Sequence, residues 1–232
     1  MKKNLDSSHP ETYWDDIYTH DLSSIPNYVS SFAKFTIEFL SSNKHHFQNS
    51  FDSLLEIACG NCRDFGFLSS YFKHSLAVDI SIPDDILENH SFITSSGKPA
   101  ILKKSNIFSL PNKNYTSANV IYSRWFLHTM NWEKMVSFFN LIFNLINLNT
   151  FCFFEFRSIR DELYKKGIKV ENDKHGYYTD HYRRFTDPID FMDLLNTAFP
   201  NIKTLFFEEL DNVSIIKDSN PTVIRCVLKK SD

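Results

Sequence analysis

The chain has 232 residues, of which 42% are hydrophobic and 23 are phenylalanine. This length and apolar content suffice for one well-filled core and exclude an intrinsically disordered chain. A formal net charge of −3 and a pI near 6.3 argue against a general binder of polymeric nucleic acid or of membrane surfaces.

Targeting signals are equally sparse. The first ten residues contain two lysines, but no apolar segment follows them, so we expect no signal peptide. No stretch approaches the roughly 20 apolar residues of a membrane span. The cysteines do not form the pattern of a secreted disulfide framework; they are Cys59, Cys62, Cys152 and Cys226. We therefore expect a cytoplasmic protein.

No linker rich in Pro, Gly or Ser divides the chain, and residues 1–232 are predicted to form one domain.

Two amphipathic helices are predicted near the N-terminus, over Glu11–His20 and Tyr28–Ser42. The second would place Phe32, Phe35 and Phe39 on one face. We expect residues 1–50 to form a helical cap on the domain. The aromatic residues of the first helix have two open interpretations: they anchor it to the core, or they cover a ligand.

Residues 53–81 (SLLEIACGNCRDFGFLSSYFKHSLAVDIS) form the most informative segment. Ser53–Cys59 is a short apolar run typical of a buried parallel strand, and Gly60 interrupts it. A helix over Arg63–Phe72 would follow, then a second buried strand that ends at Asp79. Such a unit leaves a crevice outside the strand ends, where backbone N–H groups meet a ligand.

The spacing of small residues separates two kinds of cofactor. The pyrophosphate-binding pattern G-x-G-x-x-G would place Arg63 where a small residue must pack closely, which disfavours a nicotinamide-dependent oxidoreductase. The pattern G-x-G-x-G would instead use Ala58, Gly60 and Cys62, which are all small. At Cys62 a positive φ would be costly. Asp79 follows Gly60 by 19 residues, the interval at which such folds place an acid for the ribose hydroxyls.

This segment resembles the first motif of the class I S-adenosylmethionine-dependent methyltransferases, with Glu56 as the acid, Gly60 as the central glycine, and Ala58 and Cys62 departing from the outer glycines. The resemblance implies S-adenosylmethionine as the cofactor and a short N-terminal helix folded over it. The cofactor-binding residues that we expect are Tyr13, Trp14, Glu56, Ala58, Gly60, Asn61, Arg63, Asp64, Asp79, Ile80, Asn106, Ile107, Ser123 and Arg124. Either Arg63 or Arg124 would hold the cofactor carboxylate.

Cys59 and Cys62 also form a C-x-x-C pair at a helix start, as in thioredoxin-like redox sites. A zinc site would need a second pair of ligands at matching spacing, and none is evident. We favour two small residues in a tight turn and expect no metal.

Strands and helices continue to alternate, which predicts a doubly wound α/β sheet. Further strands are predicted at 100–105, 118–123 and 151–156, and helices begin near Pro83, at Asn131 and at Asp187–Pro188. Two late strands, 202–209 and 222–229, would pair antiparallel if the resemblance holds. The predicted fold is therefore the Rossmann-like, mostly parallel seven-stranded sheet of class I methyltransferases.

Arginines gather where the ligand edge of this sheet should lie. The chain has 18 lysines but only 7 arginines, and most of the arginines follow predicted strands or lie in the segment 158–188. Because arginine binds carboxylate and phosphate with a bidentate fork, this placement predicts a small anionic acceptor. Ordinary surface ion pairs are the alternative.

We expect 158–188, rich in His, Tyr and Arg, to act as a substrate lid. The predicted substrate-binding residues are Arg124, His128, Glu155, Arg157, Arg160, Tyr178, His181, Tyr182, Arg183 and Arg184.

The predicted catalytic residues are His128, Arg157 and Tyr122. His128 is a candidate general base, with Glu155 and His181 as competitors. The Asn/Asp-Pro-Pro-aromatic signature of aminomethyltransferases is absent after the strand at 118–123, which disfavours methylation of adenine N6 or of glutamine.

The strings IYSRWFLH, FEFRSIRDELYKKG and HYRRF resemble methyltransferases encoded with bacterial capsular polysaccharide genes, including those of the O-methyl phosphoramidate pathway. The resemblance implies O-methylation of a phosphoramidate-bearing nucleotide or of a capsular sugar hydroxyl. A protein that binds the cofactor without catalysis remains an alternative.

Overall fold

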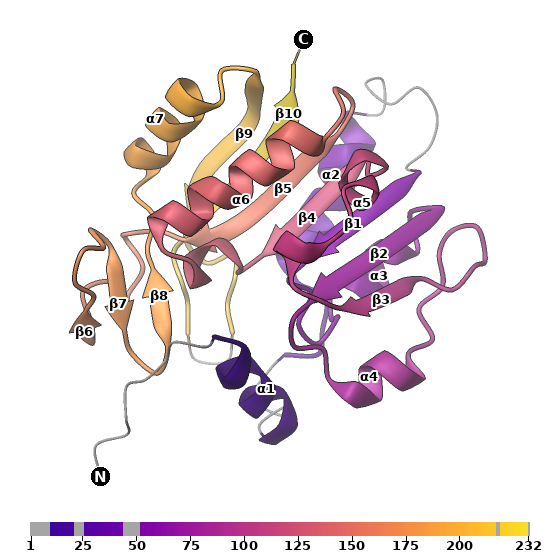
Figure 1. Ribbon diagram of the computed structural model, residues 1–232, viewed down its shortest axis with the longest axis horizontal. Helices are drawn as coiled ribbons and strands as arrows, with labels where there is room; N and C mark the ends of the chain where they lie inside the picture. The colour runs from indigo at the N-terminus through magenta and orange to yellow at the C-terminus, as the bar shows by residue number, and fades with distance from the viewer. Residues whose placement is uncertain (1–9, 21–25, 44–51, 217–218, 232) are drawn as a thin grey trace.

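The computed structural model describes residues 10–20, 26–43, 52–216 and 219–231. Seven strands form one sheet in the order β3-β2-β1-β4-β5-β10-β9 (Figure 1). The sheet strands are β1 (Ser53–Ile57), β2 (His74–Asp79), β3 (Ile101–Lys104), β4 (Val120–Arg124), β5 (Phe151–Arg157), β9 (Ile202–Leu210) and β10 (Val223–Lys230). Strands β1 to β5 run parallel, and β10 pairs antiparallel with both β5 and β9. The predicted doubly wound, mostly parallel sheet is confirmed.

Helices cover both faces of this sheet (Figure 1). They are α1 (Pro10–His20), α2 (Ser31–Ser42), α3 (Phe65–Ser69), α4 (Asp84–Asn89), α5 (Lys113–Thr116), α6 (Trp132–Leu145) and α7 (Pro188–Ala198), with the single turns η3 (Ile107–Ser109) and η4 (Leu127–Thr129). None of the helices that the structure describes has both the length and the apolar character needed to cross a membrane.

The core is divided into two layers by the alternation of side chains along the strands. In β5, Phe154 and Phe156 join the layer beneath α6 and α7. Phe151 and Phe153 join the layer beneath α2 and α3. Both faces of β5 are buried, which explains why the first four residues of the strand are all apolar.

Local signals set several helix ends. Ser30 Oγ accepts a hydrogen bond from Ala33 N at 3.0 Å, so α2 begins at Ser31, later than predicted. The predicted caps of α6 and α7 are present: Asn131 Oδ1 accepts from Lys134 N at 2.9 Å, and Asp187 Oδ1 accepts from Ile189 N at 2.9 Å. Helix α3 is shorter than the predicted Arg63–Phe72, because turn-type bonds such as Phe72 N to Ser69 O replace helical ones.

The segment 158–188 is not a simple loop. It carries a small antiparallel sheet of β6 (Ile168–Lys169), β7 (Gly176–Tyr178) and β8 (Tyr182–Arg184), which the sequence did not predict. Arg183 and Arg184 therefore lie on a strand rather than in a loop. Strand β8 lies against η4, at the carboxyl end of β4. This contact brings the segment 158–188 to the edge of the main sheet where ligands bind in such folds.

Much of the predicted N-terminal cap, including residues 1–9 and 44–50, lies outside the described residues.

Candidate functional site

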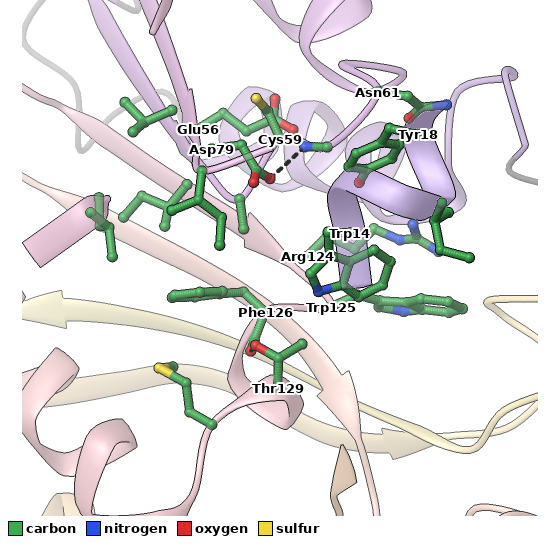
Figure 2. Close-up of a pocket in the computed structure, with 18 of the residues that line it drawn as sticks. Trp14, Tyr18, Glu56, Cys59, Asn61, Asp79, Arg124, Trp125, Phe126 and Thr129 are labelled. Carbon is green, nitrogen blue, oxygen red and sulfur yellow. Dashed lines mark hydrogen bonds between the residues drawn. The ribbon is translucent and has the colours of Figure 1, made fainter. Parts of the chain in front are cut away.

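A cavity of about 780 Å³ lies at the carboxyl ends of β1 to β4. Its size is typical of small-molecule sites. One side is formed by the strand ends and the turn after β1, and another by α1 together with the β7–β8 turn. Figure 2 shows Glu56 and Asp79 at the strand ends, with Trp14 and Tyr18 of α1 nearby and Phe126 and Thr129 across the cavity.

The turn after β1 has an alternating backbone conformation. Ala58, Gly60 and Cys62 have φ values of 59°, 54° and 58°, all in the left-handed region. These are the three positions of the predicted G-x-G-x-G spacing. Non-glycine residues pay about 1–2 kcal/mol for this conformation, so Ala58 and Cys62 store strain at the cavity wall. At Gly60 a Cβ would in addition collide with the Tyr18 hydroxyl, which adds to the cost of any side chain at this position.

Asp79 is anchored to this turn. Its Oδ2 accepts a hydrogen bond from Gly60 N at 2.8 Å, the bond drawn in Figure 2, and its Oδ1 accepts from Ser81 N at 2.9 Å. Burial raises the pKa of Asp79 to about 6, although these backbone donors oppose the shift. The carboxylate is therefore largely ionised at neutral pH and fixed in orientation at the end of β2.

Two buried polar atoms beside the turn lack a hydrogen-bond partner among the described residues, although Arg63 Nε lies 3.7 Å from Asp64 Oδ1. Glu56 Oε2 and Arg63 Nε make no hydrogen bond, although both residues line the cavity. Burial, reinforced by Asp64, raises the pKa of Glu56 well above its usual value. Since unsatisfied buried groups are costly, these atoms indicate where a polar ligand would be bound.

Asp64 has a structural role as well as a place in the cavity wall. Its carboxylate accepts hydrogen bonds from Ser30 N, Ser30 Oγ and Tyr122 Oη, each at 2.7 Å. This network joins α2 to β4 and to the turn after β1. Tyr122, a predicted catalytic residue, is fully buried, does not line the cavity, and uses its hydroxyl to hold Asp64.

Glu155 is likewise a structural centre rather than a free group. Its carboxylate accepts from Arg124 Nε at 2.8 Å, Trp125 Nε1 at 3.1 Å, Ser214 Oγ at 2.9 Å and Arg225 Nε at 2.8 Å. Glu155 is fully buried. The structure thus uses the predicted substrate ligand Glu155 to join β4, β5 and β10. Arg124 still lines the cavity.

Trp125 was not anticipated from the sequence. It has a φ of 62°, and the guanidiniums of Arg124 and Arg157 lie 4.5 Å and 5.0 Å from its ring centroid. Trp125, Phe126 and Tyr18 all line the cavity. In a chain with 16% aromatic residues, only the position of Trp125 directly after a strand end could have singled it out.

The apolar end of the cavity contains Ile80, Ile107 and Met130 together with Phe126. Asn106 also lies there, and its Oδ1 accepts from Phe108 N at 2.9 Å. The Asn106 oxygen is therefore engaged in a local turn, and its amide nitrogen remains to meet a ligand. Asn61 and Ala58 also line the cavity; Ser123, by contrast, is buried outside it.

A cluster of basic groups adjoins the cavity where η4, β5 and β8 meet. His181 and Arg183 line the cavity, while His128 and Arg157, with 3% and 5% exposure, do not. Three nitrogens of this cluster have no hydrogen-bond partner among the residues that the structure describes: His128 Nδ1, Arg157 Nε and His181 Nε2. Burial lowers the pKa of His128 well below its usual value, and Arg157 adds to the shift, so His128 is neutral at pH 7.

The cavity is covered by a roof, which we define as Tyr13 and Trp14 of α1 with Asp180, His181 and Arg183 of 158–188. Tyr13 Oη donates to Asp180 Oδ2 at 2.9 Å. The His181 ring packs 4.5 Å from the Tyr13 ring and 5.4 Å from the Trp14 ring. Arg183 donates to both carboxylate oxygens of Asp180. The two segments thus meet through residues that are 167 positions apart.

Other predicted substrate residues lie away from the cavity lining. Arg160 is exposed and pairs with Glu209 and Asp211 at 2.9 Å and 3.0 Å. Tyr182 donates to Asp173 at 2.5 Å, and its ring packs against Tyr178. Arg184 is buried, and its Nε lies 3.5 Å from Asp173 Oδ1. Its guanidinium stacks over the Trp132 ring. Tyr182 and Arg184 thus bind Asp173 within the segment 158–188, whereas Arg160 joins this segment to the end of β9.

Within the described part of the chain, one group has a spacing compatible with metal ligation: His175, Asp187 and Asp190. Lys174 Nζ already pairs with Asp190 Oδ2 at 2.7 Å. Cys59 and Cys62 are free and buried, with their sulfurs 3.6 Å apart.

No protein-family model and no curated protein matches the sequence. Solved structures match the fold. They include an S-adenosylmethionine-dependent methyltransferase from Clostridium acetobutylicum, with a TM-score of 0.64, 16% identity, and coverage of 95% of this chain and 97% of that one. The N-methyltransferase NodS from Bradyrhizobium japonicum, in complex with S-adenosylhomocysteine, gives a TM-score of 0.63, 12% identity, and coverage of 96% and 98%.

A third match is the 1,6-didemethyltoxoflavin-N1-methyltransferase from Burkholderia thailandensis, bound to that substrate and S-adenosylhomocysteine. Its TM-score is 0.60 at 11% identity, with coverage of 94% of this chain and 82% of that one. At these identities the likeness shows the fold alone: this chain has the Rossmann-like fold of class I methyltransferases.

Proposed function

We propose that this protein is an S-adenosylmethionine-dependent methyltransferase acting on a small molecule, as a single domain in the cytoplasm. The observation that carries the proposal is the strand-end cavity. There the ionised Asp79 is fixed to Gly60 N, and Glu56 Oε2 and Arg63 Nε are buried without a hydrogen bond to any described residue. Solved structures with this fold bind S-adenosylhomocysteine, which supports the same assignment.

The residues present fit this cofactor. Asp79 would accept the ribose hydroxyls, because its carboxylate faces the cavity at the end of β2. Arg63, whose Nε lies 3.7 Å from Asp64 Oδ1 but makes no hydrogen bond to the described residues, would hold the carboxylate. Ile80, Ile107 and Phe126 would pack on the adenine, and Asn106 would meet its polar edge. When bound, S-adenosylmethionine supplies a methyl group on a positively charged sulfur.

Methyl transfer by displacement depends mainly on alignment and on exclusion of water. The roof provides both: Tyr13, Trp14 and His181 form a packed aromatic cover over the cavity. Trp125 is fixed by its hydrogen bond to Glu155. Its ring would form a rigid wall between Arg124 and the part of the cavity where the methyl acceptor binds.

We further propose O-methylation of an acceptor that carries a negative charge, such as a phosphoramidate-bearing nucleotide of capsule biosynthesis. Support comes from Arg183, which lines the cavity, and from the adjoining Arg157, whose Nε has no hydrogen-bond partner among the described residues although its Nη1 pairs with Asp161. A capsular sugar hydroxyl is the alternative acceptor. His181 supports it, because a hydroxyl needs a base, whereas a phosphoramidate oxygen is already anionic.

A transfer assay with radiolabelled S-adenosylmethionine tests the proposal against phosphorylated nucleotides, phosphoramidate-bearing nucleotides and capsular sugars. We expect label in one of the charged acceptors. Calorimetry with S-adenosylhomocysteine is the independent control for cofactor binding: a folded protein that binds neither it nor S-adenosylmethionine would refute the assignment.

A further inference from the structure

Two residues of the roof form an acid–imidazole pair. His181 Nδ1 lies 3.0 Å from Asp180 Oδ2, so the carboxylate fixes the hydrogen on Nδ1. The other ring nitrogen, Nε2, is then left with its lone pair. It is buried and has no hydrogen-bond partner in the described part of the chain, although His181 lines the cavity. An imidazole held in this tautomer is arranged to accept a proton from a ligand.

Asp180 is itself fixed by several donors. The Arg183 guanidinium donates to both of its oxygens, Tyr13 Oη donates at 2.9 Å, and Thr179 Oγ1 donates at 2.7 Å. Asp180 is half-exposed, whereas the side chains of His181 and Arg183 are only 11% exposed. The pair is therefore anchored through Asp180, and His181 Nε2 is shielded from solvent.

We propose that His181 is the general base of methyl transfer, that Asp180 is its positioning residue, and that the acceptor atom is a hydroxyl rather than a preformed anion. The inference rests on the proposed function and chooses between its two acceptors. The hydroxyl proton moves to His181 Nε2 as the oxygen–carbon bond forms. The methyl–sulfur bond breaks, and its electron pair stays on sulfur, giving a neutral thioether.

His128 fits this role less well. It does not line the cavity, and the structure gives its ring no carboxylate partner among the described residues. An anionic group of the acceptor could still be bound in this cluster, because Arg157 and Arg183 adjoin His181. An acceptor with both a hydroxyl and an anionic group satisfies the whole cluster.

The groups that face His181 set the pH range of the base. They are Asp180 and Arg183 from its own segment, Tyr13 from α1, Arg157 from β5 and His128 from η4. Burial lowers the pKa of His181, Asp180 raises it, Arg183 and Arg157 lower it, and the net direction is downward. His181 is therefore unprotonated at neutral pH.

Nuclear magnetic resonance of histidine-labelled protein tests the tautomer without any acceptor. We expect His181 at pH 7 to carry its hydrogen on Nδ1, with a pKa below 6.5. Asp180→Asn should lower that pKa further, because a favourable charge is lost. Hydrogen on Nε2 in the wild type would overturn the proposal.

Turnover with the acceptor found in the transfer assay provides the second test. His181→Asn should lower kcat by about 10²–10⁴-fold and remove the acidic limb of the pH profile, with added imidazole restoring part of the rate to His181→Ala. Asp180→Asn should lower kcat about tenfold and move the limb to lower pH. His74→Asn, on the exposed start of β2, and Asp193→Asn, on the exposed side of α7, are the matched controls.

The outcomes separate the two proposals. If methylation proceeds and His181→Asn retains the full rate and pH profile, His181 is not the base, and the proposed function stands. The same holds if only a phosphoramidate oxygen is methylated. If wild-type protein neither binds S-adenosylhomocysteine nor transfers a methyl group, the proposed function fails and the inference fails with it.

Discussion

At the scale of single residues, Asp79 determines most about cofactor binding. We expect Asp79→Ala to abolish measurable S-adenosylmethionine binding, because the described residues of the turn offer no second carboxylate oriented by Gly60 N. Calorimetry on the folded variant checks this. Asp84→Ala, at the exposed start of α4, is a matched control. Wild-type affinity in Asp79→Ala would remove Asp79 from the cofactor site.

The same carboxyl predicts a pH dependence. Burial raises the pKa of Asp79 to about 6, so the ligand-accepting, ionised form predominates above that pH. Protonation removes an acceptor and a charge. We therefore expect S-adenosylmethionine affinity to be flat above about pH 7 and to fall by up to about tenfold per pH unit below 6. Calorimetry across this range measures the effect, and unchanged affinity at pH 5 would contradict it.

Arg157 offers a test of the acceptor side. We expect Arg157→Lys to lower kcat/KM by roughly tenfold or more, because it keeps the charge but loses the fork that binds an anion. S-adenosylmethionine affinity should stay within about twofold. Equal losses in both quantities would assign Arg157 to the cofactor site. If neither kcat/KM nor affinity changed, the arginine cluster would be a structural feature only, in which Arg157 pairs with Asp161.

At the scale of elements, Glu155 holds three strands together. Glu155→Gln would leave Arg124 and Arg225 buried without their countercharge. Removing one partner of a buried ion pair costs about 3–5 kcal/mol, so we expect a loss of that order in the free energy of unfolding. Urea titration measures it, with the exposed Glu88→Gln of α4 as the control. A loss below about 1 kcal/mol would show that the network relaxes without the charge.

At the scale of the whole molecule, the cavity lies between the sheet edge and the roof, so a bound ligand should stabilise both. S-adenosylmethionine at a hundred times its dissociation constant adds about 2.7 kcal/mol, which corresponds to a rise in Tm of roughly 5–11 °C for a chain of this length. Hydrogen exchange should slow in α1 and in β7–β8 as well as at the turn after β1. Thermal unfolding with Asp79→Ala as control checks this, and protection confined to the turn would contradict the role of the roof.

The main sheet could be predicted because its signals are local. Strands β1, β4 and β5 are apolar runs, and they had to be buried on both faces. Asn131 and Asp187 cap helices through neighbours two or three residues away. The interval from Gly60 to Asp79 follows from the length of one strand–helix–strand unit. Sequence therefore determined the doubly wound sheet and the position of the turn beside Asp79.

Only the tertiary structure decided which polar side chains face the cavity. Asp64 and Tyr122 bond each other across 58 residues, and Glu155 meets Arg225 across 70. No periodicity encodes such pairs, because partner choice depends on how elements pack after the chain has folded. The same packing placed Asp180 against Tyr13 and gave Trp125 its strained conformation at the strand end. Residue type and strand position thus suggested a ligand edge, whereas long-range packing selected His181 over His128 to line the cavity.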